Sequence, residues 1–97
     1  MMTHYVAIVE DEPGKAVGVW FPDLPGCFSA GDTVDEAMAN AREAVAVWAD
    51  VLSDSGQAMP DPRSLAEIRA DPEAAVDVAA YMVALIPFEP RMLSAAE

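Results

Sequence analysis

An apolar stripe at helical spacing constrains the fold of this chain more than any other feature. Between Thr33 and Gly56, apolar residues recur every three or four positions, which matches one face of an α-helix. Thr33 and Glu36 have the spacing of a capping box, and Gly56 is suited to end the helix. The predicted stripe consists of Val34, Ala37, Met38, Ala41, Ala44, Val45, Trp48, Ala49 and Leu52. The sequence therefore predicts one long amphipathic helix that packs on a sheet.

Three short segments that favour β-structure precede this helix. Residues 5–9 and 16–21 are rich in apolar and β-branched side chains, and Pro13-Gly14 between them is typical of a tight turn. Two further prolines remove backbone donors and exclude a helix before the third segment, residues 27–30. We therefore expect a three-stranded antiparallel meander.

The second half of the chain predicts shorter helices and a last strand. Residues 57–63 contain two prolines and favour an extended crossing loop. Ser64 and Glu67 form a second capping-box pattern for a short helix, and residues 71–73 favour another turn or two of helix. Residues 79–87 are apolar throughout, so we interpret them as a final strand that is buried on both faces or paired in the centre of the sheet. The predicted fold class is α+β, with the order βββα(α)β.

Length and composition fit a single small domain with one modest core. The chain has 97 residues, of which 54% are hydrophobic and 23% are charged. It contains no uncharged apolar run of about 18 to 20 residues and no signal-peptide pattern, so we expect a cytoplasmic protein outside the membrane. Cys27 is the single cysteine, which excludes an intrachain disulfide and a cysteine-based metal site.

The net charge of -12 makes direct binding to nucleic acid unexpected for this chain. A protein that neutralises several phosphates needs clustered basic residues. Here the basic residues are scattered singly, at Lys15, Arg42, Arg63, Arg69 and Arg91. An acidic surface suits a basic protein partner, although the same charge also serves solubility alone.

Three motifs in the first half of the chain resemble the signature of the HicB antitoxin family. They are FPDLPGCFSAGDT at residues 21–33, DEA at residues 35–37 and NAREA at residues 40–44. The resemblance covers about residues 5 to 54 closely, and the later proline-rich loop and apolar strand agree with it. It implies a degraded, partial ribonuclease-H-like domain that binds the HicA toxin, a small RNA-cleaving protein, and shields its catalytic surface.

The resemblance also sets expectations for domains and assembly. We expect the antitoxin domain to span residues 1–88 and a short tail to span residues 89–97, which is too few residues for the DNA-binding module of many family members. A homodimer or a higher homo-oligomer is implied by the family. An exposed sheet edge would favour the same outcome.

No pattern in the sequence predicts catalysis, a metal site or a cofactor. The predicted strands have no acidic residue in their interiors, where ribonuclease-H chemistry would need converging carboxylates. His4 and Cys27 are interpreted as a surface histidine and a core cysteine rather than a base and a nucleophile. The aromatic residues Trp20, Phe21, Phe28 and Trp48 are interpreted as core.

The candidate partner-binding residues fall into acidic and contact groups. The acidic group, at the hairpin tip and on the polar helix face, is expected to steer a basic toxin and comprises Glu10, Asp11, Glu12, Asp35, Glu36 and Glu43. The contact group comprises Trp20, Asp23, Leu24, Val47 and Val51. Val47 and Val51 lie on the flank of the helical stripe, where they suit either the edge of the core or contact with another chain.

A stand-alone module that binds a small ligand or a peptide beneath the helix is the alternative function. Such a module needs an unfilled cavity with converging polar groups. The predicted helical stripe is uniformly apolar and suits packing instead. This difference favours the antitoxin.

Overall fold

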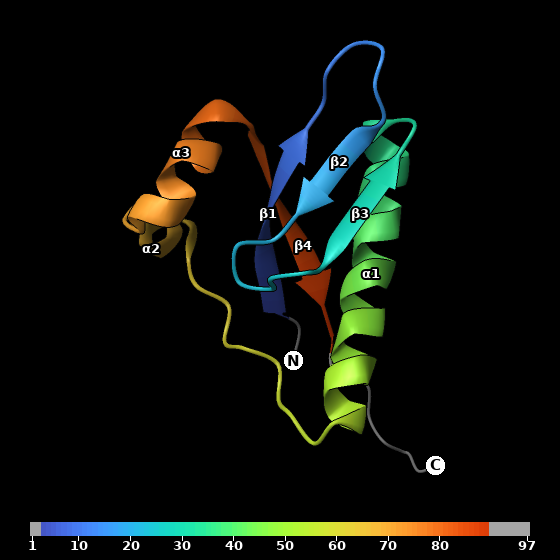
Figure 1. Ribbon diagram of the computed structural model, residues 1–97, viewed down its shortest axis with the longest axis vertical. Coiled ribbons are helices and arrows are strands. Elements are labelled where there is room, and N and C mark those ends of the chain that lie inside the picture. Colours follow the sequence, from blue (N-terminus) through green and yellow to red (C-terminus); the bar gives the residue numbers. More distant parts are fainter. Residues whose placement is uncertain (1–2, 90–97) are drawn as a thin grey trace.

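Four antiparallel strands form one sheet in the order β3-β2-β1-β4 in the computed structural model of the protein (Figure 1). The structure describes residues 3–89. The elements are β1 Thr3–Glu10, β2 Val17–Trp20, β3 Phe28–Gly31, α1 Val34–Asp54, α2 Leu65–Arg69, α3 Pro72–Ala80 and β4 Met82–Phe88. The α+β class and the predicted element order are confirmed. The predicted tail, residues 89–97, lies outside the described residues from position 90 onward.

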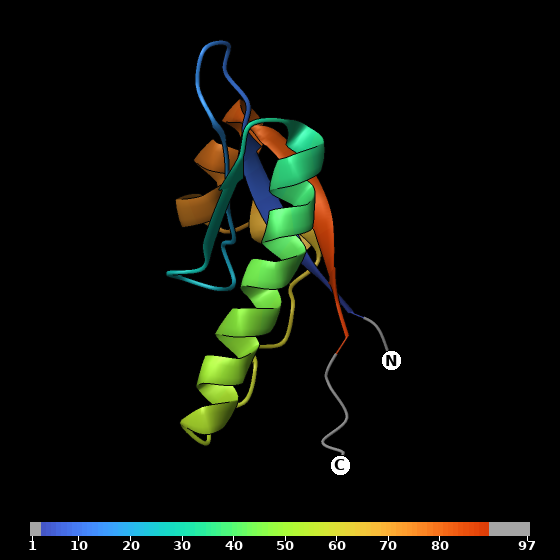
Figure 2. The ribbon, with the colours of Figure 1, turned by 90° about the vertical axis from the view of Figure 1, so that its right-hand side faces the viewer.

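The sheet is covered by helices on both faces, so the apolar residues form two clusters rather than the single core expected. Side chains of β1 alternate between them: Tyr5, Ala7 and Val9 face α1, whereas Val6 and Ile8 face α2 and α3. Figure 1 shows α1 on one side of the sheet and the two short helices on the other, and Figure 2 shows α1 lying in front of the strands.

The final strand lies at an edge of the sheet, which corrects the prediction that it is central or buried on both faces. Strand β4 pairs only with β1, and β1 is the strand with both faces buried. Leu85 in β4 is 58% exposed. Pro87 was the available signal, because proline lacks the N–H of a central strand and is tolerated at an edge.

The predicted hairpin and meander are confirmed. The Lys15 N–H donates to the Glu12 carbonyl oxygen at 3.2 Å and closes the turn, in which Gly14 has a φ of 80°. A positive φ at this third turn position is the conformation that glycine adopts without strain. The acidic hairpin tip therefore projects from one end of the sheet (Figure 1).

Helix α1 has a start and an end that follow from its capping residues. The Thr33 Oγ1 accepts from the Glu36 N–H at 3.1 Å, whereas the Glu36 carboxylate accepts from the Asp32 N–H at 2.6 Å rather than from Thr33. At the other end, the Gly56 and Gln57 N–H groups donate to the last helical carbonyls in a Schellman motif. Three residues of the predicted stripe are fully buried, namely Ala37, Ala41 and Val45.

The two short helices begin where their capping residues predict. Ser64 and Glu67 form a complete capping box. Asp71 caps α3, and Pro72 occupies its first turn, where a missing N–H costs nothing. Helix α3 is longer than predicted and takes in Ala79 and Ala80, because alanine suits a helix and the apolar run carries no break before Tyr81.

An ion-pair network ties the crossing loop to the rest of the domain. Both the backbone N–H and the Nε of Arg63 donate to the Asp23 carboxylate at 2.7 Å, and Arg63 Nη1 donates to Asp71 at 3.0 Å. The hydrogen bond from Arg63 holds the pKa of Asp71 below its usual value. Folded Asp71 thus binds a proton less readily than unfolded Asp71, so its contribution to stability is present at neutral pH. It is lost as acidification passes below the usual carboxyl range.

No helix within residues 3–89 is both long enough and apolar enough to cross a membrane.

Candidate functional site

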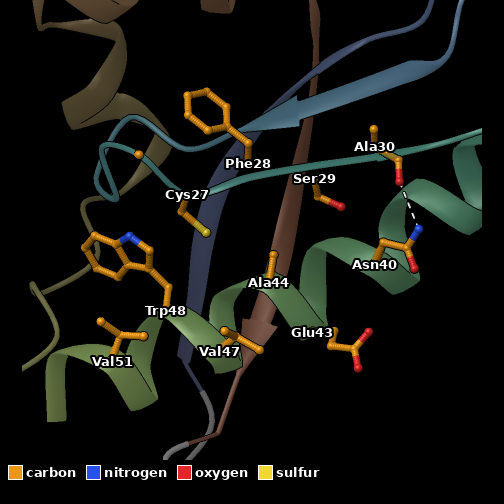
Figure 3. Close-up of a pocket in the computed structure, with 11 residues that line it drawn as sticks. Cys27, Phe28, Ser29, Ala30, Asn40, Glu43, Ala44, Val47, Trp48 and Val51 are labelled. Atoms are coloured by element: carbon orange, nitrogen blue, oxygen red, sulfur yellow. Dashed lines mark hydrogen bonds between the residues drawn. The ribbon is translucent and has the colours of Figure 1, made fainter. Parts of the chain in front are cut away.

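A groove of about 480 Å³ runs between the edge strand β3 and helix α1. Its helical wall comprises Asn40, Glu43, Ala44, Val47, Trp48 and Val51, and its other wall comprises residues 26–30 (Figure 3). The wall residues of α1 are spaced three or four positions apart, so they share one flank of the helix. The groove therefore lies where the apolar stripe of α1 borders the solvent-exposed face of the helix.

Alternation along the strand determines which groups of β3 face the groove. Ser29 Oγ donates to the Ala37 carbonyl oxygen at 3.5 Å, which places this side chain toward α1. Phe28 and Ala30 consequently lie on the opposite face of the strand, and Figure 3 shows the Phe28 ring on the side away from Trp48. The strand thus presents a polar side chain to α1 and apolar side chains to the opposite face of the sheet.

The backbone of β3 also faces the open edge. Asn40 Nδ2 donates to the Ala30 carbonyl oxygen at 2.8 Å, so this carbonyl points away from β2 (Figure 3). The N–H and C=O groups of a strand alternate in direction from residue to residue. The backbone groups of Phe28 therefore point to the same open edge as those of Ala30.

Three large apolar side chains are exposed around this edge. Phe28 is 70% exposed, Val47 is 54% exposed and Val51 is 60% exposed. The prediction that Phe28 belongs to the core is wrong. It pairs with Trp20 on the sheet face toward α2 and α3, but these helices pack against Val6 and Ile8 of β1. The face of β3 remains uncovered because the short helices lie on the other half of the sheet (Figure 1).

The predicted acidic residues of the hairpin tip and the helix occupy three places. Glu43 lines the groove, Asp35 and Glu36 lie in the first turn of α1, and residues 10–12 form the hairpin tip. Glu12 is paired with Lys15 at 3.2 Å. Of these predicted acids, only Glu43 adjoins the groove.

Comparison with known proteins decides the family. A family model described as the HicB-like antitoxin of bacterial toxin-antitoxin systems matches residues 5–96. This chain belongs to the HicB-like antitoxin family. It is 33% identical over 75 residues to antitoxin HicB 2 of Photorhabdus laumondii, a match that covers 77% of this chain and 52% of that protein. The chain spans about half the length of the relatives that it matches over the longest stretches.

Solved structures with similar folds are also HicB antitoxins. The crystal structure of the Burkholderia pseudomallei antitoxin HicB matches with a TM-score of 0.72 and 28% identity, over 93% of this chain and 64% of that chain. A chain of a HicA3 and HicB3 toxin-antitoxin complex matches with a TM-score of 0.70 and 26% identity, over 93% of this chain and 100% of that chain. The HicB-like fold therefore extends over nearly the whole chain.

Three residues of the predicted contact group are wholly or partly buried within this HicB-like antitoxin. Leu24 is fully buried, so it offers no surface to a partner. The Asp23 side chain is 6% exposed and is engaged by Arg63. Trp20 is partly buried, and its ring lies edge-on to Tyr81 at a centroid distance of 5.4 Å. Of the contact group, only Val47 and Val51 line the groove beside β3.

The groups with catalytic potential in this HicB-like antitoxin are kept apart. Cys27 is buried, and burial raises the pKa of its thiol, which disfavours the reactive thiolate. His4 lies on the other face of the sheet, beside Val6 and Val83. No group of three or more histidine, cysteine, aspartate or glutamate residues among positions 3–89 is arranged to hold a metal ion.

Proposed function

We propose that this chain neutralises a HicA-like, RNA-cleaving toxin by binding it and covering its catalytic surface. The observation that carries the proposal is the match to a chain of the HicA3 and HicB3 complex, which extends over all of that chain. The open apolar groove beside β3 supports it, because an occluding protein needs contact area and no reactive group.

Charge supports a protein partner rather than nucleic acid. The net charge of -12 repels phosphate and favours a basic toxin, and it raises the rate of association more than the final affinity. The proposal also places the chain in the cytoplasm, where the RNA substrates of such a toxin lie.

Self-association through β4 forms part of the same proposal. The β4 segment MVALIPF carries no charged residue, and Met82 and Leu85 are exposed on it. An uncharged edge strand favours pairing with a second copy, although Pro87 limits the number of backbone hydrogen bonds. A homodimer would leave the groove at the opposite edge open, since β3 and β4 are the two ends of the sheet.

Coexpression with a HicA-like toxin from the same genome tests the proposal. We expect the tagged chain to copurify with the toxin in a fixed ratio and to restore growth to cells that express the toxin. A toxin that neither copurifies nor loses its toxicity would overturn the proposed function.

Electrostatic steering predicts a specific effect of charge reversal. Asp35 and Glu43 are exposed on α1, and the hydrogen bonds described above do not involve their side chains. We expect Asp35→Lys with Glu43→Lys to lower the association rate constant about tenfold at low ionic strength, with a smaller effect at high salt. Stopped-flow mixing with the toxin measures this rate.

A matched pair of reversals controls for net charge. Asp61 and Glu73 are exposed and lie in the crossing loop and in α3, away from the groove. Asp61→Lys with Glu73→Lys gives the same net charge, and we expect it to slow association less. Equal rates for the two double variants would show that total charge, rather than the α1 acids, controls the encounter.

A further inference from the structure

The large exposed apolar side chains of this domain are concentrated around one strand. Six such side chains occur among residues 3–89, and three of them, Phe28, Val47 and Val51, border β3. The others are Val76 on α3 and Met82 and Leu85 on β4. Single exposed apolar residues are ordinary on protein surfaces, whereas a contiguous group marks an interaction site.

The group around β3 is contiguous because the groove joins its members. Val47 and Val51 flank the half-buried Trp48 ring on α1, and Ala44 continues the apolar wall toward β3 (Figure 3). Across the strand, Phe28 stands on the opposite face. The apolar surface therefore passes from α1 around the sheet edge to the other face of β3.

We propose that this surface is the toxin-docking site, and that the toxin binds the β3 edge on both faces of the sheet. The inference rests on the proposed function and names its contact surface. An apolar part of the toxin fills the groove between Val47, Trp48 and Val51, and a second part covers the Phe28 ring. An extended toxin segment between them pairs with the outward-facing backbone groups of Phe28, in the manner of an added strand.

Charge selects the toxin rather than a second copy as the occupant. Helix α1 carries five acidic residues and a single basic residue, Arg42, and Glu43 lies on the groove itself. Two copies that met through this surface would bring their acidic helices together, which disfavours association. A basic toxin meets these acids with complementary charge at the rim and apolar contacts in the centre, which is the usual plan of a protein interface.

Replacing both valines of the groove tests the toxin contact on the α1 face of the sheet. Val47→Gln with Val51→Gln removes apolar contact area, keeps the net charge and raises helix propensity, so the fold is retained. Each valine is expected to contribute about tenfold to the affinity, so the toxin should bind the double variant roughly a hundredfold more weakly. Val76→Gln is the matched control, because Val76 is 71% exposed on α3, and we expect it to bind as tightly as the wild type.

Replacing Phe28 tests the toxin contact on the sheet face opposite α1. Its ring is 70% exposed, so Phe28→Ala should leave the thermal midpoint nearly unchanged while weakening the toxin complex about tenfold. Isothermal titration with the purified HicA-like toxin measures every affinity, and sedimentation of each antitoxin variant alone measures its oligomeric state.

The binding of these variants distinguishes a wrong docking surface from a wrong function. If the wild type and Val76→Gln fail to bind the toxin, the proposed function itself is wrong. If they bind and the double valine variant binds equally well, the groove is not the docking site. An unchanged affinity for Phe28→Ala would show that the toxin does not contact both faces of the sheet. Loss of self-association in the double valine variant, with toxin affinity retained, would show that a second copy occupies the surface.

Discussion

Gly31→Ala is expected to lower the free energy of unfolding by about 3 kcal/mol, the upper end of the usual cost of overpacking. A Cβ atom at Gly31 would lie 2.5 Å from the backbone nitrogen of Ala37 and 2.9 Å from the carbonyl carbon of Glu36. These are backbone atoms at the start of α1, so no side-chain rotation relieves the clash. The helix has to move away from β3, which also widens the groove and weakens toxin binding. Chemical denaturation of the variant measures the loss of stability.

Gly18 provides the control for this substitution. It lies in the neighbouring strand, and a Cβ there would meet no atom within 4 Å. We expect Gly18→Ala to be neutral or to stabilise the fold by up to about 1 kcal/mol, because alanine loses less backbone entropy than glycine in a strand. Equal losses for the two variants would contradict the close approach of α1 to β3.

Asp23→Ala is expected to lower the free energy of unfolding by about 2 kcal/mol. The substitution removes the acceptor for both the backbone N–H and the Nε of Arg63, and it leaves these donors in a partly buried site. The crossing loop loses its attachment to the turn after β2, and α3 loses the support that Arg63 gives to Asp71. Thermal unfolding followed by circular dichroism measures the effect.

An exposed acid in the same loop is the comparison for Asp23. Asp61 lies two residues before Arg63 and its side chain is solvent-accessible, so Asp61→Ala should change stability by less than about 0.5 kcal/mol. A loss of stability for Asp23→Ala that is as small as this control would show that the ion-pair network does not stabilise the fold. In that case the geometry of the loop would have to come from packing alone.

The sequence predicts most of the elements because their signals are local. Thr33 and Gly56 delimit α1, and Ser64 delimits α2, through hydrogen bonds within a few residues. The position of β4 is not local: its pairing with β1 joins Thr3 to Phe88 across the chain. A uniformly apolar run suits a central strand, so Pro87 was the single residue that pointed to the edge.

The candidate site is predictable in part for the same reason. Val47, Val51 and Glu43 could be placed by helical spacing, since the flank of α1 follows from its own stripe. Phe28 could not, because its exposure depends on which half of the sheet α2 and α3 cover. The burial of Leu24 does not follow from its local sequence, since a turn residue between two prolines suits the surface, whereas this side chain is fully buried.

Titration of toxin-catalysed RNA cleavage with this chain measures occlusion of the toxin directly. We expect cleavage to fall in proportion to added chain and to end near the stoichiometry of the complex. We also expect the double variant Val47→Gln with Val51→Gln to require far higher concentrations than Val76→Gln for the same protection. Undiminished cleavage in the presence of excess folded wild-type chain would contradict the claim that this protein is an occluding antitoxin.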